Sequence, residues 1–224
     1  MMFRLPVQFG AAPALGWLRA MLGALFCIGL LSLICRLWLG DAVNSLPILV
    51  APIGASAVLV FALPASPLAQ PWPVIGGNLV SALMGVTIFH LVPYPNVAAG
   101  LAVALAIGAM ALLRCLHPPG GAVALTAVIG TPAIHAAGYH YALVPVALNS
   151  AILVGLAWLF NNAVRHSYPH RAVPTASVPN HDITAQDVRV ALTQYEEIID
   201  VNPDDLLMIL RAAEAEAEAR HKRR

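Results

Sequence analysis

The sequence predicts an all-α fold: a polytopic membrane helix bundle with two internal repeats, each holding a half-helix broken by proline and glycine, and a short soluble helical tail. Three observations predict this fold. The chain is 59% hydrophobic and 10% charged, with a mean hydropathy of +0.77, which is typical of membrane proteins. Residues 1–164 contain four arginines, one aspartate and no lysine or glutamate. Two similar proline–glycine interruptions divide the apolar sequence.

Four apolar segments are long enough to cross the hydrocarbon core, which takes about 20 helical residues. They cover residues 20–39, 74–92, 97–116 and 142–164. Residues 1–19 are expected to form a basic leader and residues 20–164 the membrane domain. Residues 165–224 are expected to form a cytoplasmic tail, which begins its first helix after Thr184 with a capping-box pattern.

The interruptions lie at residues 52–57 and 117–124, and both contain the pattern P-x-G-A-x-A followed by an apolar run. Proline donates no backbone hydrogen bond and pushes the residue before it out of helical geometry. A short helix then starts after each break, near Gly54 and Gly121. Because irregular backbone at membrane depth survives only in protein or beside a wet cavity, each break is a candidate functional site.

The two breaks belong to two diverged repeats, about residues 20–93 and 97–164. Small residues at four-residue spacing follow each break in corresponding positions, namely Gly77, Ser81 and Gly85 in the first repeat and Ala147, Ala151 and Gly155 in the second. Paired interruptions in corresponding halves indicate a transporter binding site.

The arginines indicate the topology. Arg4 and Arg19 precede the first span, and Arg165 and Arg171 follow the last one, so the positive-inside rule places both termini in the cytoplasm. The number of crossings must then be even. Four spans with two re-entrant half-helices give parallel repeats, and six spans give inverted repeats. The sequence leaves both open.

The composition excludes several function classes. No carboxylate lies in an apolar span, and proton relays and cation pathways in membranes are usually built from such groups. This favours a neutral or anionic cargo. Cys27, Cys35 and Cys115 have no metal-ligand spacing and are expected to be small buried hydrophobic residues. We therefore expect no metal, no cofactor, no nucleic acid and no enzymatic activity.

The candidate substrate-binding residues lie at the two breaks and on the polar positions of the helices around them. They are Gly54, Ala55, Ser56, Asn78, Arg114, His117, Pro118, Pro119, Gly120, Gly121, Thr126 and Asn149. The N–H groups in the first turn of each half-helix would bind the anion, with the glycines allowing close backbone approach.

Each polar residue also has a structural interpretation. His117 either ends a helix by bonding a carbonyl group or serves as a proton partner or anion ligand. Arg114 either reaches the membrane interface or supplies a fixed positive charge beside the site. Ser56, Asn78, Thr126 and Asn149 could each hold helices together rather than line a path.

With HPPGG after an apolar span, PIGASAVLVF, and SPLAQPWPVIGGN, the chain resembles the HPP family of integral membrane proteins over about residues 16–165. The resemblance implies a four-spanning bundle and transport, with nitrite as the solute associated with chloroplast and cyanobacterial members. Some bacterial members carry nucleotide-sensing CBS domains after the membrane part. The helical tail of this sequence has no room for one.

The sequence therefore predicts a transporter or channel for a small, nitrite-like inorganic anion, held at half-helix N-termini near the bilayer midplane. The alternative is a membrane scaffold or sensor whose tail recruits a cytoplasmic partner. The expected surroundings are the lipid bilayer of a bacterial inner membrane, and the expected assembly is a homo-oligomer.

Overall fold

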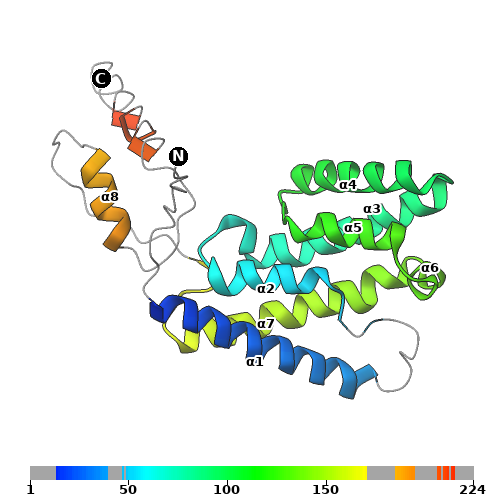
Figure 1. Ribbon diagram of the computed structural model, residues 1–224, viewed down its shortest axis with the longest axis horizontal. Helices are drawn as coiled ribbons and strands as arrows, with labels where there is room; N and C mark the ends of the chain where they lie inside the picture. Colours follow the sequence, from blue (N-terminus) through cyan, green and yellow to red (C-terminus); the bar gives the residue numbers. More distant parts are fainter. Residues whose placement is uncertain are drawn as a thin grey trace, which may run out of the picture. The chain divides into compact units, whose positions relative to one another are not determined.

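The computed structural model describes residues 14–39, 47, 49–170, 185–194, 206–207, 209–211 and 213–214 (Figure 1). These residues contain helices and no strands, as the predicted all-α fold requires. Leu18–Arg171 form one compact unit, which is the helix bundle. The tail helix α8 (Ala185–Gln194) belongs to a second unit. It starts where the sequence predicts, and Val188 is buried on one of its faces.

The bundle contains six principal helices and one short one. The helices are α1 (Ala14–Leu39), α2 (Pro52–Ala62), α3 (Asn78–Leu91), α4 (Pro95–Leu112), α5 (Pro119–Ile129), α6 (Pro132–Ala137) and α7 (Leu148–Ala163). Turns of π-helix, Pro73–Gly77 and Ala142–Ala147, lead directly into α3 and α7. Four helical stretches are long and apolar enough to cross a membrane: Gly16–Trp38, Pro73–Leu91, Pro95–Leu112 and Ala142–Ala163.

Helices α2 and α5 are the two predicted half-helices. Each has 11 residues, a rise of about 16 Å, which is roughly half the hydrocarbon thickness. Each begins with a proline at its first helical position, where the missing N–H would have had no partner in the helix. The predicted starts at Gly54 and Gly121 are two residues late for this reason.

Contacts between connections define the two ends of the bundle. At the His117 end, Trp72 Nε1 donates to the Leu113 carbonyl oxygen (3.1 Å) and the Tyr168 hydroxyl donates to the Ala69 carbonyl oxygen (2.9 Å). At the Tyr139 end, the Tyr139 hydroxyl lies 3.0 Å from Thr87 Oγ1. Residues 64–72, 113–118 and 164–170 therefore gather at one end, and residues 130–141 lie at the other.

The six principal helices run alternately between these ends. Cys27 Sγ lies 3.8 Å from the Leu156 carbonyl oxygen, and Asn149 Nδ2 lies 3.4 Å from Cys35 Sγ, so α1 is antiparallel to α7. Helices α1, α3 and α5 run from the His117 end to the Tyr139 end, and α2, α4 and α7 run back. The directions in α1–α2–α3 are thus reversed in α4–α5–α7, whereas the internal repeats and the number of membrane crossings stay predictions.

The two halves also match in detail. Their half-helices are of equal length, and the π-helical turns before α3 and α7 end at Gly77 and Ala147, the positions that correspond in the sequence repeat. Matching irregularities at matching positions support the duplication, which stays a prediction.

Helix α3 packs against α5 through small residues. A Cβ atom added at Gly85 would lie 2.5 Å from the Ala124 carbonyl oxygen, so only glycine permits this approach. By contrast, Gly100 and Gly108 of α4 face open space. These two glycines belong to a row of small residues, a pattern typical of helix–helix contacts, but the row lies on the outside of the bundle.

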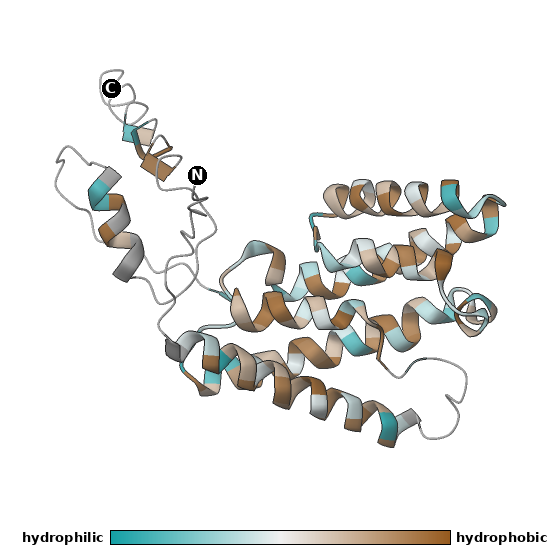
Figure 2. Cartoon of the chain, viewed as in Figure 1, coloured by the Kyte–Doolittle hydropathy of each residue, from teal (hydrophilic) through white to brown (hydrophobic). Residues whose placement is uncertain are grey.

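Most residues of the bundle helices are hydrophobic (Figure 2), and many large apolar side chains are exposed. Helix α1 exposes Met21, Leu25, Phe26 and Leu33, whereas its buried face presents residues such as Leu31 to the core. Exposed apolar side chains in such numbers are unfavourable in water and are expected where lipid is the solvent.

Candidate functional site

The two proline–glycine breaks meet inside the bundle. Ser56, in the second turn of α2, places its Oγ atom 2.9 Å from Nε2 of His117, which directly precedes Pro118, the residue before α5. Both side chains are fully buried. Segments 61 residues apart in the chain therefore form one polar contact in an apolar core.

His117 is held at both ring nitrogens. Its Nδ1 atom lies 2.8 Å from the Leu68 carbonyl oxygen, which can only accept, so Nδ1 carries a hydrogen. Pro118 keeps the backbone of His117 out of helical geometry, which turns the ring away from α5 and towards the connection 64–72. In a neutral ring Nε2 is then an acceptor for the Ser56 hydroxyl, which also lies 3.3 Å from the Pro52 carbonyl oxygen.

Asn78 and Ser150 extend this contact across α3 and α7. Asn78 Nδ2 donates to Ser56 Oγ (3.3 Å) and to Ser150 Oγ (3.1 Å), and the Ser150 hydroxyl donates to the Val146 carbonyl oxygen (2.8 Å). Both residues are fully buried. We call Ser56, Asn78, His117 and Ser150 the polar cluster.

Two glycines allow the backbone to come close to the polar cluster. A Cβ atom on Gly77 would lie 2.6 Å from the Cys115 carbonyl oxygen and 2.7 Å from His117 Cβ. One on Gly120 would lie 2.5 Å from Ser81 Oγ. Such separations are far shorter than real Cβ contacts, so α3 packs on the second break only because both residues lack a side chain.

The glycines that the sequence singled out for close approach, Gly54 and Gly121, are placed differently. Nothing lies within 4 Å of a Cβ atom on Gly54, and the nearest atom to one on Gly121 is Val103 Cγ1 at 3.8 Å. Gly54 is exposed and Gly121 half-buried. Neither glycine is therefore required by the packing of the protein around it, and the close approach of an anion at these two positions stays a prediction.

The expected row of unpaired N–H groups is also absent from the described breaks. The N–H groups of Ile53 and Gly54 donate to the carbonyl oxygens of Val50 and Ala51, at 2.9 and 3.0 Å. Those of Gly120 and Gly121 donate to His117 and Pro118, at 2.8 and 3.1 Å. The residues before each half-helix form a helical turn whose carbonyl groups occupy the donors, so only the dipole of each helix start remains.

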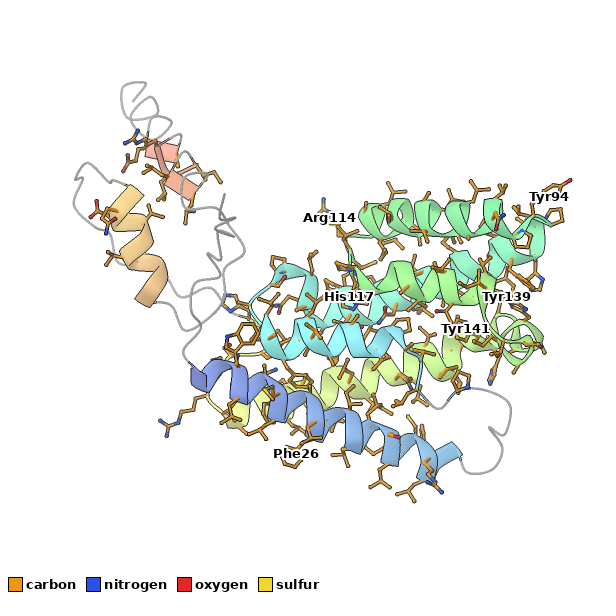
Figure 3. All side chains as sticks on the ribbon, in the orientation of Figure 1. Phe26, Tyr94, Arg114, His117, Tyr139 and Tyr141 are labelled. Atoms are coloured by element: carbon orange, nitrogen blue, oxygen red, sulfur yellow. The ribbon has the colours of Figure 1, made fainter. Side chains whose placement is uncertain are left out.

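Several other predicted residues lie outside the polar cluster. Arg114 is exposed and points away from the helices, whereas His117 lies among them (Figure 3). Thr126 Oγ1 donates to the Ala122 carbonyl oxygen of its own helix at 2.7 Å. Asn149 joins Val50 N (3.2 Å) to Cys35 Sγ (3.4 Å) and forms a separate buried polar group.

At the breaks themselves, only some predicted residues are enclosed. Pro119 and Gly120 are buried with His117, whereas Ala55 and Pro118 are exposed. The structure thus brings together Ser56, Asn78 and His117 of the predicted set, with Gly120 packed beside them.

Sequence reasoning missed Ser150 and the Leu68 carbonyl group. Ser150 follows Asn149 directly, and one residue along a helix turns a side chain by about 100°, so the two face different neighbours. The sequence does show two adjacent polar residues, Asn149 and Ser150, in one apolar span. This pattern does not indicate which of the two faces the breaks. A backbone carbonyl leaves no sequence signal.

The connection that holds His117 is itself anchored by the segment after α7. The Tyr168 hydroxyl donates to Ala69, next to Leu68, and the His170 backbone N–H donates to Gln70 Oε1 at 2.9 Å. Burial raises the pKa of the Tyr168 phenol, so its hydroxyl stays protonated as a donor. The start of the tail therefore fixes the connection that orients the imidazole ring.

Within the described part of the chain, no three histidine, cysteine or acidic side chains are grouped as a metal site requires. The three cysteines are free and buried, and burial raises the pKa of the Cys115 thiol.

The fold and the break motifs agree with comparisons to known proteins. Two proteins of Dictyostelium discoideum, each described as a transmembrane protein, are 40% and 42% identical to this chain over 127 and 126 residues. Each match covers 54% of this chain, and 44% and 40% of the respective relatives, so the chain matches less than half the length of either. No solved structure matches the chain.

The model of the HPP transmembrane region matches residues 10–169, which include all six principal bundle helices and both breaks. This confirms the resemblance that the HPPGG motif indicates. The chain is an integral membrane protein and belongs to the HPP transmembrane family.

Proposed function

We propose that this protein is a transporter or channel for a small inorganic anion of the size of nitrite, and that the polar cluster is its binding site. The observation that carries the proposal is the 2.9 Å contact between Ser56 and His117. It joins two interruptions that occupy corresponding places in two halves of opposite direction, and such paired interruptions are where substrates bind in many transporter folds.

The polarity of the cluster supports a role beyond helix packing. Four fully buried polar side chains from α2, α3, α7 and the connection before α5 lie together in a bundle that lipid surrounds. Polar side chains inside a membrane bundle are energetically costly, and where they occur they commonly mark a solute pathway. A packing role alone would be served by small apolar residues like those between α3 and α5.

The charge of the bundle supports an anion over a cation. The sequence has no aspartate or glutamate between Asp41 and Asp182, so no carboxylate from that stretch can offset a positive charge. The starts of α2 and α5 flank the cluster, and their partial positive charges favour an anion without a direct N–H bond. In this site His117, Ser56 and Asn78 would contact the solute, and Gly77 and Gly120 would keep α3 close.

We further propose that the protein lies in a bacterial inner membrane with both termini in the cytoplasm. The arginines at positions 4, 19, 165 and 171 support this orientation by the positive-inside rule. The even number of principal helices in the bundle is consistent with it.

The test is nitrite influx into vesicles that contain the purified full-length chain, with protein-free vesicles as background. Ser56→Ala and Asn78→Leu each remove one member of the cluster and should weaken apparent affinity about fivefold or more, since one hydrogen bond contributes about 1 kcal/mol. Thr87→Val is the matched control, because Thr87 lies on α3 near the Tyr139 end and bonds only Leu83 and Tyr139.

We expect nitrite influx in the parent and in the Thr87→Val control, and reduced influx in the two cluster variants. If the full-length chain gives no influx above the protein-free vesicles, the transport proposal fails. The scaffold alternative, in which the tail recruits a cytoplasmic partner, would then be the function to test.

A further inference from the structure

Every hydrogen bond that the structure gives to the polar cluster reaches a neutral group. The partners are backbone carbonyl oxygens, two serine hydroxyls, one amide and one imidazole. Arg114 is the charged residue nearest to His117 in the sequence, and it is exposed. A bare anion in the cluster would therefore lie in an apolar core without a full opposite charge, which is strongly unfavourable.

The directions of these hydrogen bonds follow from one fixed group. The Leu68 carbonyl oxygen accepts from His117 Nδ1, and the Ser56 hydroxyl has two acceptors within reach, the Pro52 carbonyl oxygen at 3.3 Å and His117 Nε2 at 2.9 Å. The Ser150 hydroxyl donates to a backbone carbonyl oxygen. Since both serine hydrogens are used, both serine oxygens are acceptors towards Asn78.

Asn78 must then face the serines with its NH₂ group, and its Oδ1 atom points elsewhere. That oxygen is buried and has no hydrogen-bond partner in the structure. A buried amide oxygen without a partner costs about 1–3 kcal/mol. An anion cannot satisfy it, because an anion offers only acceptors, whereas a solute with an O–H or N–H group can.

We propose that the cluster binds its solute as the neutral, protonated acid, a small monoprotic oxoacid such as nitrous acid, whose O–H group donates to Asn78 Oδ1. This inference rests on the proposed function and assigns the form of the solute that the site accepts.

The chemistry balances without a further reactant. On one side of the membrane the anion takes up one proton to give the acid, and on the other side the acid releases it. No other bond is made or broken. One proton moves with each anion, so transport carries no net charge.

The experiment uses vesicles containing the full-length chain, a pH indicator inside, and potassium with valinomycin to set the membrane potential. Nitrite is added outside. The expected result is acidification of the interior with one proton per nitrite, at a rate that does not change when the potential is set positive or negative inside. Protein-free vesicles measure the acid that crosses the lipid itself.

Two variants make the test specific to Asn78. Asn78→Leu removes the unpartnered oxygen and should reduce the protein-dependent influx about fivefold, as expected for one lost hydrogen bond. Asn161→Leu is the matched control: Asn161 is a buried amide of α7 whose Oδ1 also lacks a partner, and its Nδ2 donates to Val60 rather than to the cluster.

The outcomes separate this inference from the proposed function. Influx that rises with a positive interior and leaves the interior pH unchanged would show a bare anion, which overturns the neutral-acid inference and keeps the transporter. Equal losses in Asn78→Leu and Asn161→Leu would also overturn it, because the effect would then not depend on the cluster. No protein-dependent influx at all would refute the proposed function.

Discussion

Replacing Gly77 by alanine tests whether close packing of α3 on the second break holds the site together. The added Cβ atom would lie 2.6 Å from the Cys115 carbonyl oxygen and 2.7 Å from His117 Cβ. Neither neighbour is the free end of a flexible side chain, so α3 and the connection 113–118 must separate. Overpacking of this kind costs about 1–3 kcal/mol, which corresponds to a fall in melting temperature of roughly 2–12 °C for a chain of this size.

The measurement is thermal unfolding of the purified protein in detergent, followed by intrinsic fluorescence, together with nitrite influx in vesicles. Gly54→Ala is the matched control, because its Cβ atom meets nothing within 4 Å and alanine favours a helix over glycine by about 1 kcal/mol. Gly77→Ala should lower both melting temperature and influx, whereas Gly54→Ala should leave stability equal or higher. Equal melting temperatures for the two variants would refute the packing argument.

Four further predictions follow from the bundle and its anchored connection. His117→Ala leaves the half-buried carbonyl oxygen of Leu68 without this donor and should cost about 1 kcal/mol in the free energy of unfolding, measured by denaturant titration; an unchanged midpoint would contradict this. Tyr168→Phe removes the bond to Ala69 and should cost about 1 kcal/mol. Because burial raises the pKa of Tyr168, melting curves should show the same loss at about pH 6 and about pH 9, and a loss confined to one pH would count against this bond. A chain ending at residue 171 should insert and carry nitrite like the parent, since Leu18–Arg171 form a compact unit; loss of influx would make the tail part of the mechanism. Reporter fusions before residue 4 and after residue 171 should both read cytoplasmic, and one external signal would mean an odd number of crossings.

The fold class and the positions of the helices could be predicted from the sequence. Four apolar runs of about 20 residues can satisfy their backbone hydrogen bonds in lipid only as helices. The prolines at 52 and 119 mark the starts of two 11-residue helices. These are local properties, set by hydropathy and by the missing N–H of proline. Helix α6 was missed because its six residues, Pro132–Ala137, are too few to show a periodic pattern.

The composition of the candidate site could be predicted only in part. The motifs indicated that the breaks at Ser56 and His117 matter, but their contact spans 61 residues. Asn78 was included and Ser150 was not, although both are equally buried in the cluster. A polar residue in an apolar span shows that a partner is needed, whereas the identity of that partner depends on helix rotation and on which helices are neighbours.

What the sequence by itself determined is the local chemistry: apolar helices, two proline-started half-helices, and the absence of carboxylates from residue 42 to residue 181. Only the tertiary structure decided which glycines are indispensable, that the first N–H groups of α2 and α5 already have partners, and that Asn78 Oδ1 has none. The physical reason is that hydropathy and backbone preferences act within a few residues. Steric contact and hydrogen-bond satisfaction depend instead on atoms that distant segments bring to within about 3 Å of each other.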